Sequence, residues 1–145
     1  KRIEKDILLL DAADIFNSEK LSRYAKGVKF EETMVRIFTI LGYKVMHTGK
    51  AGDQGCDFIL SKDDRRIAVQ AKNMQGNTGN DAVQEAISAR EMKNANEAWV
   101  VTTANKFTNK AKELARGTDV KLFDKKHVLN WMSEAAGELR RKEQN

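Results

Sequence analysis

Three polar residues lie at the outer ends of two short apolar segments, and their types suit a site for a hard cation. Asp57 precedes the segment "FILS", and Gln70 and Lys72 close the segment "RIAVQAK". A carboxylate and a neutral amide oxygen are ligands that Mg²⁺ accepts while it keeps several waters. A nearby ammonium can orient or help deprotonate such a water, or stabilise developing negative charge. This set predicts metal-assisted hydrolysis, and a phosphodiester is the natural substrate for a basic protein.

The alternation of side chains along a strand indicates which of these groups point the same way. Gln70 and Lys72 are two residues apart and therefore share one face of the strand. If the hairpin turn is centred on Asp63 and Asp64, Asp57 lies opposite Gln70, with their Cβ atoms about 4.5–5.5 Å apart. A turn one residue longer would change this register, so the pairing depends on the turn.

Helical periodicity adds a second acid. In the predicted helix "KFEETMVRIFTILG", Glu31 shares its face with Val35 and Phe38, at the edge of the apolar stripe. Its neighbour Glu32 shares a face with Arg36, as expected for a solvated ion pair. A carboxylate that points toward the packed side is unfavourable without a partner. A metal ion, or water bound to it, would provide that partner for Glu31.

The elements expected to position these residues predict an α/β fold. Helices are predicted over residues 3–16, 29–42, 81–93, 109–116 and 125–141, and strands over residues 43–47, 57–61, 66–72, 97–103 and 119–123. Asn80, Thr108 and Asp124 are the predicted N-caps of the last three helices, and Gly42 and Gly117 are predicted to end two helices. This order favours a mixed sheet with helices on both faces.

Composition indicates one soluble domain with an anionic partner. The chain has 145 residues and a net charge of +5, with the basic excess concentrated in residues 105–145. No apolar run reaches the roughly 20 residues that span a bilayer, so no membrane association is expected. Cys56 is the single cysteine, which favours a reducing, cytoplasmic location. The first residue is a lysine and not a methionine, which fits either a fragment of a longer protein, with an additional domain before Lys1, or a trimmed chain.

Several short motifs carry a resemblance to a known family. In chain order they are Phe30-Glu31, Leu41-Gly42-Tyr43, Gly52-Asp53-x-Gly55-x-Asp57, Val69-Gln70-x-Lys72, Val100-Val101-Thr102-Thr103, Phe107-Thr108 and Leu122-Phe123-Asp124. Together they resemble the Mrr-type restriction endonucleases of the PD-(D/E)XK nuclease superfamily, over roughly residues 30–131. The resemblance implies the restriction-endonuclease-like fold and a Mg²⁺-dependent DNA endonuclease of the restriction or DNA-defence type, with Mn²⁺ able to substitute.

The resemblance also implies roles for individual residues. Asp57 would be the central metal ligand, and Gln70 would replace the acid of the superfamily motif as a further ligand. The backbone carbonyl of Ala71 would bind the same ion, Lys72 would be the catalytic lysine, and Glu31 would be the acid supplied by the first core helix.

Domain organisation and assembly follow from the same resemblance. Residues 1–28 have no counterpart in the family core and are expected to form a helical extension or linker. Residues 29–145 would form the catalytic domain. Enzymes of this kind commonly act as dimers when they cut both strands, so a homodimer is expected.

Five further residues are candidates for contacts with DNA, namely Lys50, Arg65, Thr102, Lys106 and Lys110. The lysines and the arginine equally fit ordinary surface charges, and Thr102 fits a strand end with its hydroxyl in water.

Two alternative functions stay open. One is a structure-specific nuclease of the Holliday-junction-resolvase type, and the other is a catalytically silent DNA-binding module of the same fold.

Overall fold

The computed structural model describes residues 23–47 and 58–144. Its helices are α2 (Arg23–Ile40), α3 (Asn80–Met92), α4 (Asn109–Thr118) and α5 (Lys125–Gln144). Its strands are β1 (Lys44–His47), β2 (Phe58–Lys62), β3 (Arg65–Lys72), β4 (Asn77–Thr78), β5 (Glu97–Thr102), β6 (Lys106–Phe107) and β7 (Val120–Phe123). Residues 1–22 of the predicted N-terminal extension lie outside the described residues.

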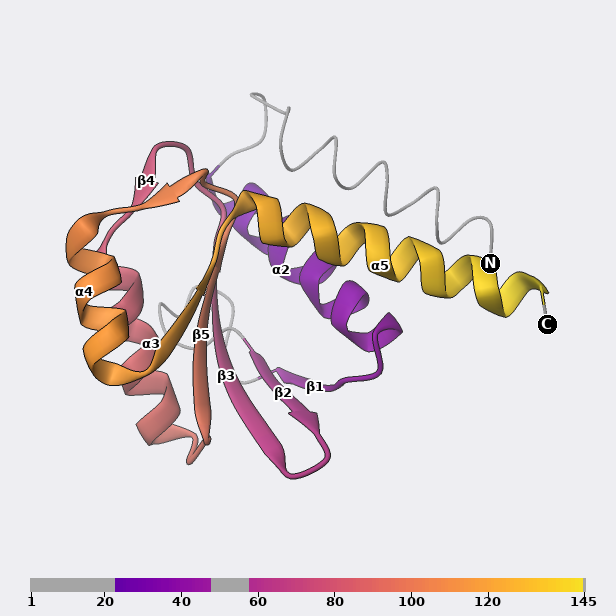
Figure 1. Ribbon diagram of the computed structural model, residues 1–145, viewed down its shortest axis with the longest axis horizontal. Coiled ribbons are helices and arrows are strands. Elements are labelled where there is room, and N and C mark those ends of the chain that lie inside the picture. Colours follow the sequence, from indigo (N-terminus) through magenta and orange to yellow (C-terminus); the bar gives the residue numbers. More distant parts are fainter. Residues whose placement is uncertain (1–22, 48–57, 145) are drawn as a thin grey trace.

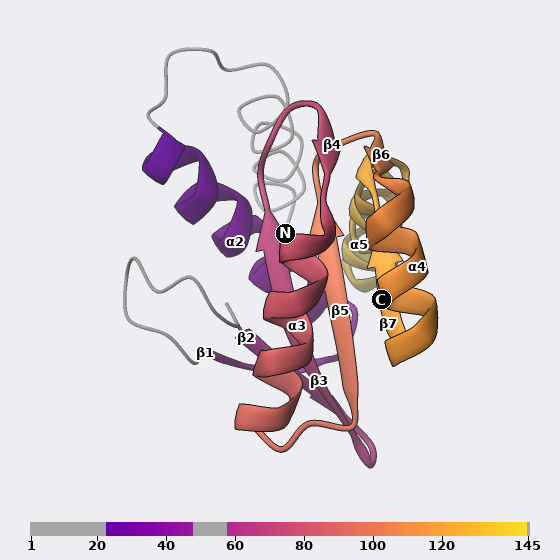
Figure 2. The same cartoon turned by 90° about the vertical axis from the view of Figure 1, so that its left-hand side faces the viewer.

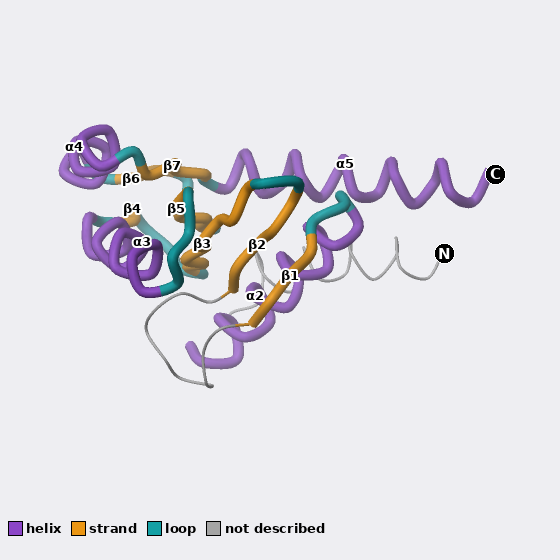
Figure 3. Tube along the Cα trace, turned by 90° about the horizontal axis from the view of Figure 1, so that it is seen from below, coloured by secondary structure: helices purple, strands orange, loops and turns teal. Residues whose placement is uncertain are grey.

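A five-stranded mixed sheet forms the centre of the molecule, with the strand order β1-β2-β3-β5-β7 (Figure 1). β1, β2 and β3 are antiparallel neighbours, whereas β3, β5 and β7 run parallel. α2 and α5 cover one face, and α3 and α4 cover the other, as the view from below shows (Figure 3). This arrangement confirms the predicted α/β class with helices on both faces.

The β2–β3 hairpin has the predicted register. Its described pairs run from Phe58 opposite Val69 to Lys62 opposite Arg65. The turn between the strands consists of Asp63 and Asp64, and Asp63 adopts the left-handed conformation with φ of 55°. A two-residue turn fits a left-handed first residue, because that conformation follows the twist of the two strands.

Two apolar layers pack against the sheet, because successive side chains of each strand point to opposite faces. Ile67, Val69 and Trp99 face α2 and α5, where Trp131 stacks on Trp99 with ring centroids 6.0 Å apart. On the other face, Val100 packs with small residues of α3 and α4. Even-numbered positions of β3, including Gln70 and Lys72, therefore belong to the face that α3 covers.

Two of the predicted helix caps are confirmed. The Thr108 hydroxyl accepts a hydrogen bond from the Ala111 N–H at 3.1 Å, at the start of α4. The carboxylate of Asp124 accepts from the backbone N–H groups of Lys126 at 3.0 Å and His127 at 3.4 Å, at the start of α5. These side chains satisfy N–H groups that a helix cannot pair internally.

Two other predicted helix boundaries are wrong by one or two residues. Asn80 is the first residue of α3, and the cap position belongs to Gly79, which makes no side-chain cap. α4 continues through Gly117 to Thr118, and the left-handed residue that ends it is Asp119, with φ of 58°. An aspartate tolerates the left-handed conformation because its short polar side chain can form local contacts. The end of α4 therefore does not require Gly117.

A second, two-stranded sheet was not predicted. β4 and β6 are each two residues long and pair in parallel, with Asn77 opposite Lys106 and Thr78 opposite Phe107. They follow the carboxyl ends of β3 and β5, at the end of the sheet away from the β2–β3 turn (Figure 2). Segments this short carry no detectable strand periodicity, which is why the sequence indicated only loops.

Candidate active site

Gln70 is the most informative residue at the carboxyl end of β3. Its side chain is only 2% exposed, on the face that α3 covers. Its Oε1 atom is buried and accepts no hydrogen bond from any residue in the described ranges. A buried amide oxygen without a donor costs free energy, because it has lost its water. The position therefore suits an oxygen that is to be met by a cation or by a ligand.

Lys72 lies two residues further along the same face and is held by an acid that the sequence analysis did not consider. Its Nζ is 2.9 Å from Oε2 of Glu85, which α3 supplies. Glu85 Oε2 is buried and faces the Lys72 ammonium as an ion pair. Gln70, Lys72 and Glu85 thus belong to one polar group between β3 and α3.

The spacing of apolar residues along the predicted helix over residues 81–93 already indicated the position of Glu85. Ala82 and Ala89 are three and four residues away from Glu85, and both are buried in the structure. Glu85 therefore lies beside the packed side of α3, whereas Gln84 is exposed. The same reasoning that distinguished Glu31 from Glu32 would have selected Glu85 from sequence alone.

Glu31 lies at the same end of the sheet but over the opposite face. It projects from α2 with Oε1 3.6 Å from Nδ1 of His47, the last residue of β1. Burial raises the pKa of the Glu31 carboxyl above its usual range, and the adjacent His47 partly offsets this rise. The structure thus supports the expected half-buried carboxylate, and brings it to His47 rather than into contact with Gln70 or Lys72.

The strand pairing relates the two faces. His47 pairs with Phe58, which in turn pairs with Val69, the residue before Gln70. Glu31 and Gln70 are therefore both at the end of the sheet where β1 ends and β2 begins. Asp57 and Lys50 lie outside the described residues.

Ala71 is directed away from the group formed by Gln70, Lys72 and Glu85. Its side chain packs against the core on the α2 and α5 face, and its backbone pairs with Val101 of β5. This alternation puts the methyl group in the core while the flanking Gln70 and Lys72 face α3.

Hydroxyl groups tie the segments around the site together. The Thr102 and Thr78 hydroxyls are 2.8 Å apart in a buried contact, and the Ala104 N–H donates to Thr102 at 3.1 Å. The Thr103 N–H donates to the carbonyl of Lys72 at 3.0 Å, and the Thr103 hydroxyl donates to Asn73 at 2.9 Å. These bonds fix the backbone just beyond β3 and β5, where the site lies.

Among the described residues, no group of three His, Cys, Asp or Glu side chains could hold a metal ion by itself. The candidate ligands for a hard cation are of two kinds, the amide oxygen of Gln70 and the carboxylate of Glu85. Both groups offer oxygen atoms, which are the ligands that Mg²⁺ prefers, and the buried Gln70 Oε1 accepts no hydrogen bond from the described residues. The residues present therefore fit a divalent cation, completed by ligands from water, substrate or the rest of the chain.

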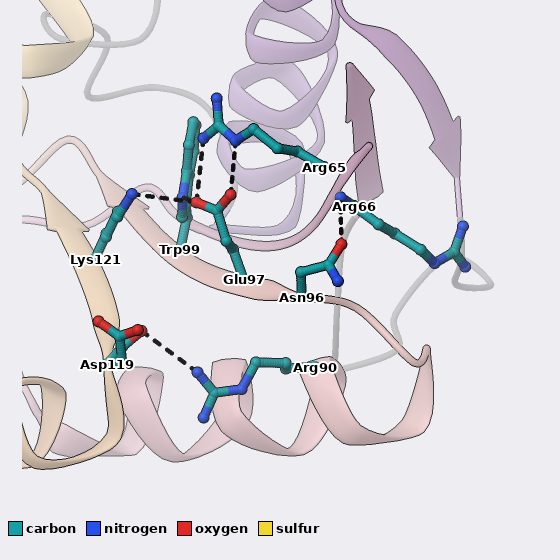
Figure 4. A network of polar contacts seen from close by, with 8 residues as sticks. All are labelled: Arg65, Arg66, Arg90, Asn96, Glu97, Trp99, Asp119 and Lys121. Atoms are coloured by element: carbon teal, nitrogen blue, oxygen red, sulfur yellow. Dashed lines mark hydrogen bonds and ion pairs between the residues drawn. The ribbon is translucent and has the colours of Figure 1, made fainter. Parts of the chain in front are cut away.

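The described candidates for DNA contacts divide into three environments. Lys106 and Lys110 are exposed, on β6 and the first turn of α4, at the same end as Gln70. Thr102 is 0% exposed, and its hydroxyl is engaged internally, so its place suits support of the site better than direct contact with DNA. Arg65 lies at the opposite end of the sheet, beside the hairpin turn, and forms a two-point contact with Glu97 (Figure 4).

In the part of the chain that the structure describes, no helix is long and apolar enough to cross a membrane.

Comparisons with known proteins agree with this architecture. A solved structure titled DNA modification-dependent restriction endonuclease AspBHI matches with a TM-score of 0.55 and 15% sequence identity, over 96% of this chain and 38% of that one. The chain thus spans well under half of that protein, and the likeness concerns the fold. No curated protein matches the chain. The sequence model for the catalytic domain of Mrr, described as a restriction endonuclease, matches residues 23–132. The chain therefore belongs to the Mrr-type restriction endonuclease family.

Proposed function

We propose that this chain is the catalytic domain of a DNA endonuclease that hydrolyses phosphodiester bonds with Mg²⁺, or with Mn²⁺ in its place. The observation that carries the proposal is the buried Oε1 of Gln70, which accepts no hydrogen bond from the described residues. Gln70 lies two residues before Lys72, on the same face of β3. A strand that only served the core would have no reason to bury an amide oxygen in this state.

Each polar residue has a proposed task. Asp57 and the Gln70 amide oxygen bind the cation, together with the Ala71 carbonyl. Asp57 immediately precedes Phe58, Gln70 immediately follows Val69, and Phe58 pairs with Val69, which supports their assignment to one site. When bound, the cation polarises the phosphate and lowers the pKa of a coordinated water.

Lys72 is assigned to the attacking water. Its ammonium can orient that water and stabilise the negative charge that develops on the phosphate oxygens. Glu31 is assigned to a second metal ion or to the water network at the same end of the sheet, where its carboxylate is half-buried beside His47. Lys106 and Lys110 are assigned to DNA phosphates, because both are exposed beside this end.

The proposal is tested by incubating the chain with supercoiled plasmid, branched DNA and methylated DNA, with Mg²⁺ or Mn²⁺. We expect Asp57→Ala and Lys72→Ala to lower cleavage by about 100-fold or more. Asp64→Ala and Lys112→Ala are matched controls, since they remove an exposed acid and an exposed lysine elsewhere. Wild-type inactivity on all three substrates would reject the enzyme, and full activity of both site variants would reject the assignment.

The choice of substrate also distinguishes the alternatives. Cleavage of branched DNA alone would identify a structure-specific nuclease of the Holliday-junction-resolvase type. Binding of DNA without cleavage of any substrate would identify a silent binding module.

A further inference from the structure

We propose that Glu85 supplies a carboxylate to the cation site, so that α3 provides the acid that β3 lacks at Gln70. This inference rests on the proposed function, since it concerns the ion of the same site. It assigns a metal ligand to a helix that the motif Val69-Gln70-x-Lys72 does not include.

The first support is the state of two oxygen atoms. Gln70 Oε1 is buried and accepts no hydrogen bond within the described ranges, and the buried Glu85 Oε2 is met by the Lys72 ammonium. The two oxygens belong to neighbouring elements, because Lys72 follows Gln70 on the same face of β3 and its Nζ is 2.9 Å from Glu85 Oε2. A buried amide oxygen without a donor is unfavourable unless a positively charged group meets it, and Glu85 is the carboxylate that α3 brings to the same polar group as Gln70.

The second support is the balance of charge. On the described part of β3, Gln70 is neutral and Lys72 is positively charged, so this face of the strand offers a cation no carboxylate. Mg²⁺ is usually bound through one or two carboxylates together with waters and phosphate oxygens. Glu85 offsets the charge of Lys72 and supplies a carboxylate on this face.

Lys72 is the partner that Glu85 Oε2 meets in the structure, with Nζ 2.9 Å from this oxygen. A divalent cation held by Glu85 would compete with Lys72 for this oxygen, and the Lys72 ammonium would then be available to the water and the phosphate.

The test measures the binding of Mn²⁺ to the metal-free chain without DNA, from the electron paramagnetic resonance signal of free Mn²⁺. We expect Glu85→Gln to weaken Mn²⁺ binding by about tenfold or more, because even groups that only support metal ligands contribute about 10–100-fold. Glu91→Gln is the matched control, since Glu91 is an exposed acid on the same helix. Lys72→Ala should bind Mn²⁺ at least as tightly as the wild type, because it removes the competitor for Glu85.

The opposite results would overturn the inference. If Glu85→Gln binds Mn²⁺ as tightly as Glu91→Gln, Glu85 only holds Lys72. Glu85→Asp keeps the carboxylate on a shorter side chain and should bind with intermediate affinity, which preserves the test if Glu85→Gln does not fold. A wild type that does not bind Mn²⁺ overturns the inference together with the metal site. A wild type that binds Mn²⁺ through Glu85 but cleaves no DNA rejects the proposed function and leaves the inference intact.

Discussion

Arg65 and Glu97 form a two-point contact across the end of the sheet that lies opposite the candidate site. Nε and Nη2 of Arg65 donate to the two carboxylate oxygens of Glu97 at 2.7 and 3.1 Å. Lys121 Nζ and the Trp99 indole N–H also approach Glu97 Oε1, at 3.2 and 3.3 Å. One carboxylate therefore connects β3, β5 and β7 (Figure 4).

Glu97→Gln should destabilise the fold and remove the part of the pH dependence of the unfolding free energy that comes from this carboxylate. The hydrogen bond from Arg65, the largest cause, lowers the pKa of Glu97 from 4.5 to about 2. A lowered folded pKa contributes stability that is complete above the ordinary pKa and is lost as the pH falls toward the folded one. Because Arg65 and Lys121 are largely exposed, we expect a loss of only about 1–2 kcal/mol at pH 7.

The measurement is the free energy of unfolding in urea between pH 7 and the lowest pH at which the chain stays folded. The difference in unfolding free energy between Glu97→Gln and the wild type should become smaller below about pH 4.5. Glu113→Gln, a change of an exposed acid on α4, is the control. A constant gap across this range would show that the carboxylate is not stabilised by its partners.

Much of the fold could be predicted because two periodicities are readable in the chain. Alternation along residues 58–62 and 65–72 set the faces of the hairpin, and the polar pair Asp63–Asp64 set its turn, so the register was correct. Helix ends were less predictable, because several residue types satisfy the same end. Gly79 and Asp119 serve where Asn80 and Gly117 were expected.

The site was less accessible from sequence because its parts come together only in the folded chain. The face shared by Gln70 and Lys72 follows from strand alternation alone. The contact of Lys72 with Glu85 depends on how α3 packs on β3, which no local pattern specifies. The contact of Glu31 with His47 likewise depends on the packing of α2 against β1.

A second prediction concerns the left-handed residue of the hairpin turn. Asp63→Val should lower the free energy of unfolding by about 1–2 kcal/mol, because a branched side chain is strained at φ of 55°. Asp63→Gly should be tolerated, since glycine adopts this conformation without strain. Asp64→Val is the matched control, as Asp64 is exposed and is not in the left-handed region. Equal losses for the two valine variants, measured by urea unfolding, would contradict this account.

A third prediction concerns the buried hydroxyl contact beside the site. Thr102→Val should cost about 1–3 kcal/mol, because it leaves the Ala104 N–H without its acceptor and removes the partner of Thr78. Thr102→Ser keeps the hydroxyl and should cost less. Thermal unfolding of the two variants compares them directly. A valine variant as stable as the serine variant would show that the hydroxyl contributes nothing.

The last prediction distinguishes the two ends of the sheet by their effect on DNA binding. Lys106→Ala and Lys110→Ala should each weaken binding without dependence on sequence, and should each reduce the salt dependence of the affinity by about one unit of slope. Both lysines are exposed at the end that carries Gln70. Arg65→Ala should leave the slope unchanged, because Arg65 is at the other end and its charge is already met by Glu97.

Fluorescence anisotropy of a labelled duplex, measured without divalent metal at several salt concentrations, gives these slopes. Arg65→Ala removes the contact with Glu97 and can lower the stability of the fold. The comparison is therefore made at a temperature where this variant is fully folded. If Arg65→Ala lowers the slope as much as Lys106→Ala does, DNA extends over the hairpin turn as well as the site. If neither lysine changes the slope, the phosphate contacts lie elsewhere, and the end of the sheet that carries Gln70 is not the one that meets DNA.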